Sequence, residues 1–205
     1  MNIFFYNFEF SFIDFGLAAL LLIFFGIQLY YYLRYFRGII RHHKKEKKDK
    51  LTFHNEQTPV SIVICARDEE ENLRKFLPFF LEQDYPDFEV IVVNDASFDN
   101  TDDYLSLMMK SYPHLRTTFV PDGTTNLSTK KLGITLGIKA AKNDLILLTD
   151  AECMPEGKDW VARMARNFTP ETEFVLGYGG YLGKKGFRNK LIKYDTLFVA
   201  MQYMG

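Results

Sequence analysis

Residues 60–101 read VSIVICARDEEENLRKFLPFFLEQDYPDFEVIVVNDASFDNT. Two short apolar runs rich in β-branched residues predict buried strands at 60–66 and 88–94. Between them, residues 70–82 carry apolar side chains at helical spacing, which predicts a helix that ends before the Asp-Tyr-Pro turn at 84–86. A strand, a helix and a second strand in this order indicate a βαβ unit with parallel strands.

The same alternation continues along the rest of the chain. Helices are expected at 101–111, at 129–141 after a cap at Ser128 or Thr129, at 160–168 and at 189–203, and strands at 115–120, 144–150 and 174–177. The predicted fold class is therefore α/β, with a mainly parallel, doubly wound sheet flanked by helices. Ligands bind beyond the carboxyl ends of such strands, and these ends precede acidic loops after residues 66, 94 and 150.

Carboxylates occupy each of these three loops. Asp68 and Glu69 follow the first strand, where acids at a helix start also stabilise the helix dipole. Asp95 follows the second strand and is placed to accept hydrogen bonds from a nucleobase or from ribose hydroxyls. Asp150 and Glu152 follow the fourth strand, and two carboxylates at this spacing offer the hard oxygen ligands that suit Mg²⁺ or Mn²⁺.

Other residues of these loops have two interpretations. Lys130 and Lys131 begin a helix, where cations oppose the helix dipole; pairing with phosphates explains them, and so does simple solvation. Asp99 and Thr101 are residue types that favour turns and helix caps, and they are assigned those local roles. The loop after the first strand has no GxGxxG turn and no P-loop.

The first fifty residues predict a membrane anchor. Residues 15–33 carry no charge, and at about 1.5 Å per residue they form a helix of roughly 28 Å, close to the ~30 Å bilayer core. Three tyrosines end this run at 30–32, and eight Lys or Arg against two acids follow between residues 34 and 50. The charge bias predicts a single-pass protein of the plasma (inner) membrane, with the N-terminus outside and the following domain in the cytoplasm.

The predicted domains are an anchor at 1–36, a basic juxtamembrane linker at 37–57 and an α/β domain at 58–205. A cleaved signal peptide is disfavoured because the positive charges follow the apolar run instead of preceding it. A buried core helix is the other alternative, although 19 uncharged residues are long for one. Nucleic acid is not expected as a partner, because the net charge is −1 and the basic stretch adjoins the predicted membrane span.

Four motifs in register resemble those of the family 2 glycosyltransferases, which have a GT-A fold. In this sequence the motifs are VSIVICARDEEENL at 60–73, QDYPDFEVIVVNDASFDNT at 83–101, TKKLGITLGIKAA at 129–141 and TDAECMP at 149–155. Three positions depart from the family pattern. Cys65 stands where the family has proline, Asn94 replaces the first Asp of its segment, and Glu152 replaces the second Asp of the metal motif.

The resemblance implies a role for each matching residue. The residues that would bind a nucleotide-diphospho-sugar are Ala66, Asp68, Glu69, Asp95, Lys130 and Asp150. Within this set, Asp95 is implied to hold the base or the ribose, and Lys130 to approach the diphosphate. Asp150 is implied to contact the ribose and the metal, with Glu152 as the direct ligand of Mg²⁺ or Mn²⁺.

The activity that the resemblance implies is inverting transfer of a sugar from a nucleotide-diphospho-sugar, with a cell-envelope or lipid-linked acceptor. The family's general base and its Gln-x-x-Arg-Trp segment have no counterpart before Gly205. The chain is therefore expected to be truncated, and to bind the donor while transferring sugar poorly or not at all. The alternative function is a non-catalytic, membrane-anchored nucleotide-sugar-binding protein or assembly partner. A nucleotidyltransferase is disfavoured because residues 66–72 contain no glycine.

Overall fold

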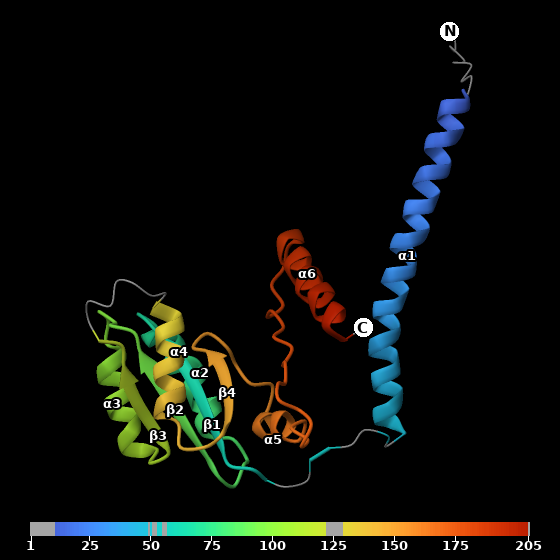
Figure 1. Ribbon diagram of the computed structural model, residues 1–205. Helices are drawn as coiled ribbons and strands as arrows, with labels where there is room; N and C mark the ends of the chain where they lie inside the picture. Colours follow the sequence, from blue (N-terminus) through green and yellow to red (C-terminus); the bar gives the residue numbers. More distant parts are fainter. Residues whose placement is uncertain (1–10, 49, 51–52, 55–56, 122–128, 205) are drawn as a thin grey trace. The chain divides into compact units, whose positions relative to one another are not determined.

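The computed structural model describes residues 11–48, 50, 53–54, 57–121 and 129–204 (Figure 1). The chain divides into two compact units, one formed by residues 52–177 and the other by residues 1–51 together with 178–205. The predicted domain limits, at residues 36 and 57, stay predictions.

Residues 52–177 contain a parallel sheet of four strands. The strands are β1 (Val60–Ala66), β2 (Phe88–Asn94), β3 (Leu115–Phe119) and β4 (Leu145–Asp150), in the spatial order β3-β2-β1-β4. β1 and β2 are central and buried over nearly their whole length, which explains why their sequences are almost continuously apolar. The predicted α/β fold with a mainly parallel sheet is confirmed.

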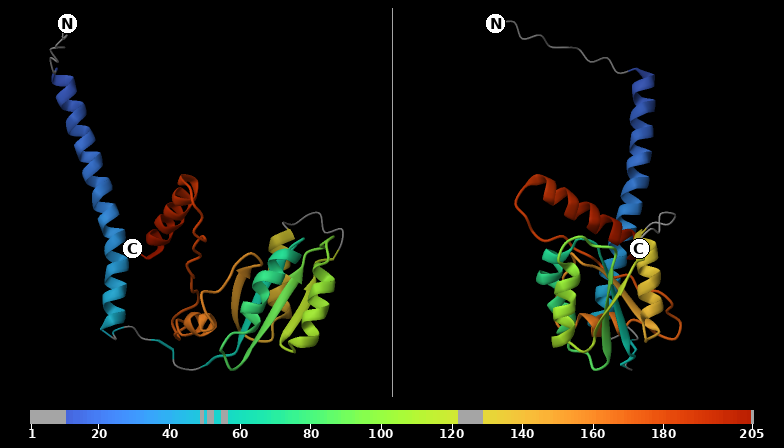
Figure 2. Two further views of the ribbon diagram at one scale, coloured as in Figure 1. Left: turned by 180° about the vertical axis from the view of Figure 1, so that it is seen from behind. Right: turned by 90° about the vertical axis from the view of Figure 1, so that its left-hand side faces the viewer.

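Helices cover both faces of this sheet (Figure 2). On one face, α2 (Glu70–Leu81), α3 (Thr101–Ser111) and α5 (Trp160–Ala165) supply side chains to a core with Ile62, Ile64, Val90 and Val92. On the other face, α4 (Thr129–Ala140) packs on Val63, Ile91 and Val93. Successive strand residues point to opposite faces, so the two cores use alternate positions of β1 and β2.

Gly137 allows α4 to lie close to the sheet. A Cβ atom at this position would overlap Cγ1 of Val63 and lie 3.0 Å from Cγ2 of Val93. Both valines are buried, and a β-branched side chain has little rotamer freedom with which to move away. The close approach therefore depends on a residue without a side chain.

We expect Gly137→Ala to lower the free energy of unfolding by about 1–2 kcal/mol, because overpacking costs more than the roughly 1 kcal/mol gained in helix propensity. Urea unfolding of the full chain in detergent, followed by the fluorescence of the single tryptophan, measures this. The double variant Val63→Ala/Gly137→Ala should lose less free energy of unfolding than the two single variants lose together, since the overlapping methyl group of Val63 is gone. A Gly137→Ala variant as stable as the wild type would contradict the close packing.

A buried carboxylate ties the sheet to the turn between α4 and β4. Glu89 accepts hydrogen bonds from Ser61 Oγ at 2.8 Å, from Lys142 N–H at 2.7 Å and from Arg116 Nη1 at 3.0 Å. Ser61 Oγ in turn accepts a hydrogen bond from Asn143 N–H at 3.2 Å. The Glu89 side chain is only 7% exposed, so the carboxylate at the centre of this network is buried.

The structure differs from the sequence prediction at two elements, and a third prediction falls on a residue that the structure does not describe. The strand predicted at 174–177 is wrong: these residues are described and form no strand, because a strand needs a partner ladder that an apolar run does not itself provide. The helix predicted at 160–168 ends at Ala165, and residues 167 and 168 continue with i→i−3 hydrogen bonds. Ser128, predicted as a cap of α4, lies outside the described residues.

The second unit contains α1 (Phe12–Lys47) and α6 (Phe187–Met204). A capping box at Ser11 and Asp14 begins α1, and the helix continues without a break through the basic residues up to Lys47. Among the described residues, α1 is the helix that is long and apolar enough to cross a membrane, and its apolar side chains are exposed. This feature is compatible with the predicted membrane anchor.

α1 and α6 contact each other through aromatic side chains. The hydroxyl oxygens of Tyr32 and Tyr194 are 3.4 Å apart, and the rings of Tyr32 and Phe198 are stacked with centroids 6.0 Å apart. The ring of Phe36 lies 4.6 Å from that of Tyr32 on the same helix. These contacts define the side of α1 that faces α6.

Candidate functional site

The carboxyl ends of β1, β2 and β4 meet at one edge of the sheet. In the register of the strands, Cys65 pairs with Asp150 and Ala66 pairs with Asn94. Asp95 continues this alignment, because its N–H donates a hydrogen bond to the carbonyl oxygen of Ala66 at 2.8 Å. The three acidic loops predicted from the sequence therefore lie together, at the edge where ligands of parallel sheets bind.

Hydrogen bonds in both directions join the loop after β1 to the loop after β2. Asp68 N–H donates to Ser97 Oγ at 3.0 Å, and Phe98 N–H donates to Asp68 Oδ1 at 2.6 Å. One oxygen of Asp68, predicted as a ligand-binding residue, is therefore engaged within the protein. Glu69 accepts a hydrogen bond from Asn72 at 2.5 Å, which gives this predicted site residue a local partner as well.

Asp99 stabilises the starts of two helices. Its Oδ1 accepts a hydrogen bond from Thr101 N–H at 3.0 Å, and its Oδ2 accepts one from Glu70 N–H at 3.0 Å. The N-cap residue of α3 is Asn100 and not Asp99. Burial acts to raise the pKa of Asp99, but the hydrogen bonds from Thr101 and Glu70 outweigh burial and lower it. The bond to α2 was not predicted, because it joins loops that are distant in sequence.

Two residues of the joined loops have left-handed backbone conformations. Asp68 has φ +52° and Ala96 has φ +49°, a region that glycine enters readily and alanine does not. Aspartate tolerates this region better than alanine because its short polar side chain bonds locally. Ala96 is therefore a strained position next to the site.

We expect Ala96→Gly to raise the free energy of unfolding by roughly 0.5–1 kcal/mol, since the relief of left-handed strain exceeds the extra entropy that glycine loses on folding. Urea unfolding measures the shift, and Ala96→Val should lower stability because a β-branched residue enters this region least readily. Equal stability of the glycine, alanine and valine variants would show that residue 96 is not held in this conformation.

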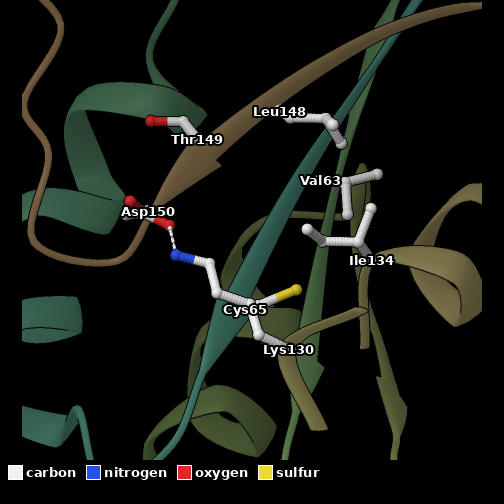
Figure 3. Close-up of a pocket in the computed structure, with 7 residues that line it drawn as sticks. All are labelled: Val63, Cys65, Lys130, Ile134, Leu148, Thr149 and Asp150. Atoms are coloured by element: carbon white, nitrogen blue, oxygen red, sulfur yellow. Dashed lines mark hydrogen bonds and ion pairs between the residues drawn. The ribbon is translucent and has the colours of Figure 1, made fainter. Parts of the chain in front are cut away.

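A pocket of about 220 Å³ lies between the sheet and α4 at this edge (Figure 3). Its lining side chains come from β1, β4 and α4: Val63, Cys65, Lys130, Ile134, Leu148, Thr149 and Asp150. Val63 pairs with Leu148 and Cys65 with Asp150, and paired residues of neighbouring strands point to the same face. The strand register thus turns the Asp150 side chain toward α4.

Lys130 and Asp150 form an ion pair at the mouth of this pocket. Lys130 Nζ lies 2.9 Å from Asp150 Oδ1, and both side chains are more than half exposed (63% and 51%). The hydrogen bond to Asp150 raises the pKa of Lys130, so the ammonium is firmly charged. The structure therefore brings together the cation predicted for phosphates and the carboxylate predicted for a metal.

Cys65 is half-buried and contributes its thiol to the same pocket. Burial raises the pKa of Cys65, and the nearby Lys130 ammonium opposes that effect only in part. The thiol is therefore neutral and fills space beside Gly133, where a Cβ atom would lie 3.3 Å from the sulfur. The motif comparison identifies Cys65 in place of proline, but its position in the pocket follows only from the packing of α4 on the sheet.

The remaining predicted site residues lie outside the pocket. Asp95 is buried at the end of β2, with its Oδ2 at 4.0 Å from Arg67 Nη1, a neighbour that the sequence analysis missed. Glu152 is exposed in the turn after β4. A second pocket, of about 400 Å³, is lined by residues 94, 96–98, 102 and 119–121 and includes none of the predicted site residues.

The chemistry of Asp150 and Glu152 fits a divalent cation that is completed by its ligand. Within the described ranges, no group of three or more His, Cys, Asp or Glu side chains is arranged to hold a metal ion. Mg²⁺ is typically held by one or two carboxylates together with water and substrate phosphates, and two carboxylates satisfy that requirement. These residues would thus hold the metal only as part of a complex with a phosphate-containing ligand.

Solved structures of other proteins are similar to this chain. The mannosyltransferase PcManGT from Pyrobaculum calidifontis, in complex with GDP-Man and Mn²⁺, superposes with a TM-score of 0.59 and 23% identity over 76% of this chain and 44% of that protein. The structure of residues 1–349 of Staphylococcus aureus TarS superposes with a TM-score of 0.45 and 20% identity, over 51% of this chain and 30% of that one. Mycobacterium tuberculosis glucosyl-3-phosphoglycerate synthase superposes with a TM-score of 0.39 and 16% identity, over 52% of this chain and 39% of that one.

The chain spans less than half the length of each of these three proteins. A search of curated proteins found no match. The sequence model of Glycosyl transferase family 2 matches residues 61–201, which is more than half of the chain and includes the sheet except for Val60, the first residue of β1. The motifs after β1, β2 and β4, the parallel sheet and this match agree, and the chain belongs to Glycosyl transferase family 2.

Proposed function

We propose that this chain binds a nucleotide-diphospho-sugar and takes part in inverting transfer of the sugar to a cell-envelope or lipid-linked acceptor. The observation that carries the proposal is the convergence of Asp95, Lys130 and Asp150 at one sheet edge in a member of this family. PcManGT, which shares the fold, was solved with GDP-Man and Mn²⁺, and this supports a nucleotide sugar and a divalent cation as ligands.

The nucleoside would lie over the ends of β1 and β2. Asp95 offers a carboxylate to a base N–H or to ribose hydroxyls, and the backbone of Ala66 is hydrogen-bonded to it at 2.8 Å. Asp68 and Glu69 would line the same side, on the loop that Ser97 and Phe98 hold in place. Because these loops are already joined, little ordering is needed when the ligand binds.

The diphosphate would lie between α4 and the end of β4. Lys130 would exchange its Asp150 partner for phosphate oxygens, and both are exposed enough for this exchange. Asp150 and Glu152 would then hold Mg²⁺ or Mn²⁺ together with the diphosphate. When bound, such a metal supplies charge neutralisation for the diphosphate as it leaves.

α1 would anchor the protein in the plasma (inner) membrane. The helix is apolar and exposed up to its tyrosine-rich end and strongly basic after it. By the charge bias of its flanks, the N-terminus would lie outside and residues 52–177 in the cytoplasm, where nucleotide sugars are available.

The proposal can be tested by calorimetric titration of the full chain in detergent with UDP- and GDP-linked sugars. The titration is done in Mg²⁺, in Mn²⁺ and in excess EDTA. We expect saturable binding that EDTA weakens strongly. Absence of binding to every nucleotide sugar in either metal would refute the proposal, whereas binding of equal affinity in metal and in EDTA would refute only the metal site. Donor binding without transfer of labelled sugar to extracted lipids would favour the alternative, a non-catalytic nucleotide-sugar-binding protein.

A further inference from the structure

Three arginines lie on one face of α1 directly after its apolar part. Arg34, Arg37 and Arg41 are spaced by three and four residues, which places successive side chains on the same face of a helix. All three side chains are exposed. No hydrogen bond or ion pair joins any of them to another residue in the described part of the chain.

The opposite face of α1 is already in use. Tyr32 and Phe36 lie two positions before and after Arg34, and two positions correspond to about 200° of rotation around an α-helix. Tyr32 contacts Tyr194 and Phe198 of α6. The packing with α6 therefore leaves the arginine face open.

The arginines also differ in depth from the lysines that follow. At about 1.5 Å per residue, Arg34 to Arg41 lie within roughly 12 Å of the end of the apolar run at residue 33, and the next lysines lie about 16–21 Å beyond it. A headgroup layer is about 5–8 Å thick, and charges interact over a Debye length of about 8 Å. The arginines therefore lie within reach of lipid headgroups, and Lys44, Lys45 and Lys47 lie at or beyond that limit.

We propose that Arg34, Arg37 and Arg41 form a binding face for the phosphate groups of anionic phospholipids in the leaflet beside residue 34. The inference rests on the membrane-spanning placement of α1 in the proposed function. Guanidinium groups suit this role because their planar fork donates two hydrogen bonds to one phosphate. Lipid bound on this face fixes the rotation of α1, with α6 on the opposite side.

Native mass spectrometry of the full chain, released from nanodiscs of equal phosphatidylglycerol and phosphatidylcholine content, tests this binding. We expect the wild type to retain roughly ten-fold more phosphatidylglycerol than phosphatidylcholine, or a larger excess, because each basic residue is attracted to an anionic surface. Arg34→Gln/Arg37→Gln/Arg41→Gln should reduce this preference at least ten-fold. The matched variant Lys44→Gln/Lys45→Gln/Lys47→Gln removes the same number of charges. The lipid preference of this variant should stay within two-fold of the wild type, because these lysines lie at or beyond the reach of the headgroups.

Equal loss of preference in the two triple variants would overturn the proposal, because net charge alone would then account for lipid binding. A wild type without preference would overturn it too. Calorimetry on the same variants separates this result from the proposed function: nucleotide-sugar binding should be unchanged in both. Failure of the wild type to bind nucleotide sugars would count against the proposed function and not against lipid binding.

Discussion

Asp150→Asn should weaken the binding of a nucleotide-diphospho-sugar in Mn²⁺ by at least roughly a hundred-fold, because residues that merely orient metal ligands already contribute ten- to a hundred-fold. The Asp150 side chain is turned toward the α4 pocket by its register with Cys65, so the amide would stay in place without offering an anionic ligand. Glu152→Gln should weaken the binding of the nucleotide-diphospho-sugar in Mn²⁺ to a similar extent. Calorimetric titration at fixed Mn²⁺ measures both.

The ion pair of Asp150 gives this experiment an internal control. Asp150→Asn frees the Lys130 ammonium, 2.9 Å away, for phosphate. In EDTA the variant should therefore bind the nucleotide sugar at least as well as the wild type. Glu156→Gln removes a carboxylate that is 92% exposed in the segment after β4, and it should leave binding unchanged. If Asp150→Asn lost affinity equally with and without metal, Asp150 would contact the nucleotide sugar and not the metal.

Glu89→Gln should lower the free energy of unfolding at neutral pH by about 2–4 kcal/mol, a large part of the stability of a typical domain. The glutamate accepts three hydrogen bonds in a buried position, and an amide at that place turns an NH₂ group toward at least one of the three donors. Urea unfolding followed by the fluorescence of Trp160 measures the loss.

Arg116→Gln is the matched control for the Glu89 network. The Arg116 side chain is 40% exposed, so solvent screens its ion pair and can replace part of it. Glu89 also keeps its bonds from Ser61 and Lys142 in this variant. The loss should therefore be smaller, about 1 kcal/mol. Equal losses in the two variants would mean that the ion pair, and not the buried carboxylate, carries the effect.

The contribution of Glu89 to the free energy of unfolding should also depend on pH. Burial acts to raise its pKa, but the hydrogen bonds from Lys142, Ser61 and Arg116 outweigh burial and lower it. The unfolded chain then binds the proton more tightly, so this contribution is complete above the ordinary glutamate pKa of about 4.3 and is lost as the pH falls through the lowered value. The stability difference between wild type and Glu89→Gln should shrink below about pH 4. A difference that stays constant down to pH 3 would contradict the lowered pKa.

Several features of this protein could be predicted from the sequence because they depend on local patterns. The limits of β1, β2 and α3 agree with prediction. For β1 and β2, apolar runs bounded by turn residues leave little choice of limits. The meeting of the acidic loops after residues 66, 94 and 150 was also predictable, because parallel strands place their carboxyl ends at one edge. The individual ligand roles of the site residues stay predictions.

The tertiary structure alone decided the contacts between segments distant in sequence. Asp99 accepts hydrogen bonds from the first residue of α2 as well as of α3, and Lys130 pairs with Asp150. The bond to α2 and the ion pair cannot be found by counting residues, because distance along the chain says little about distance in space. The apolar run at 174–177 failed as a strand for a similar reason, since a strand requires a neighbouring ladder. The sequence by itself determined the family, the carboxyl ends of β1, β2 and β4 and the residue types at the site, whereas packing of α4 on the sheet decided which charges meet there.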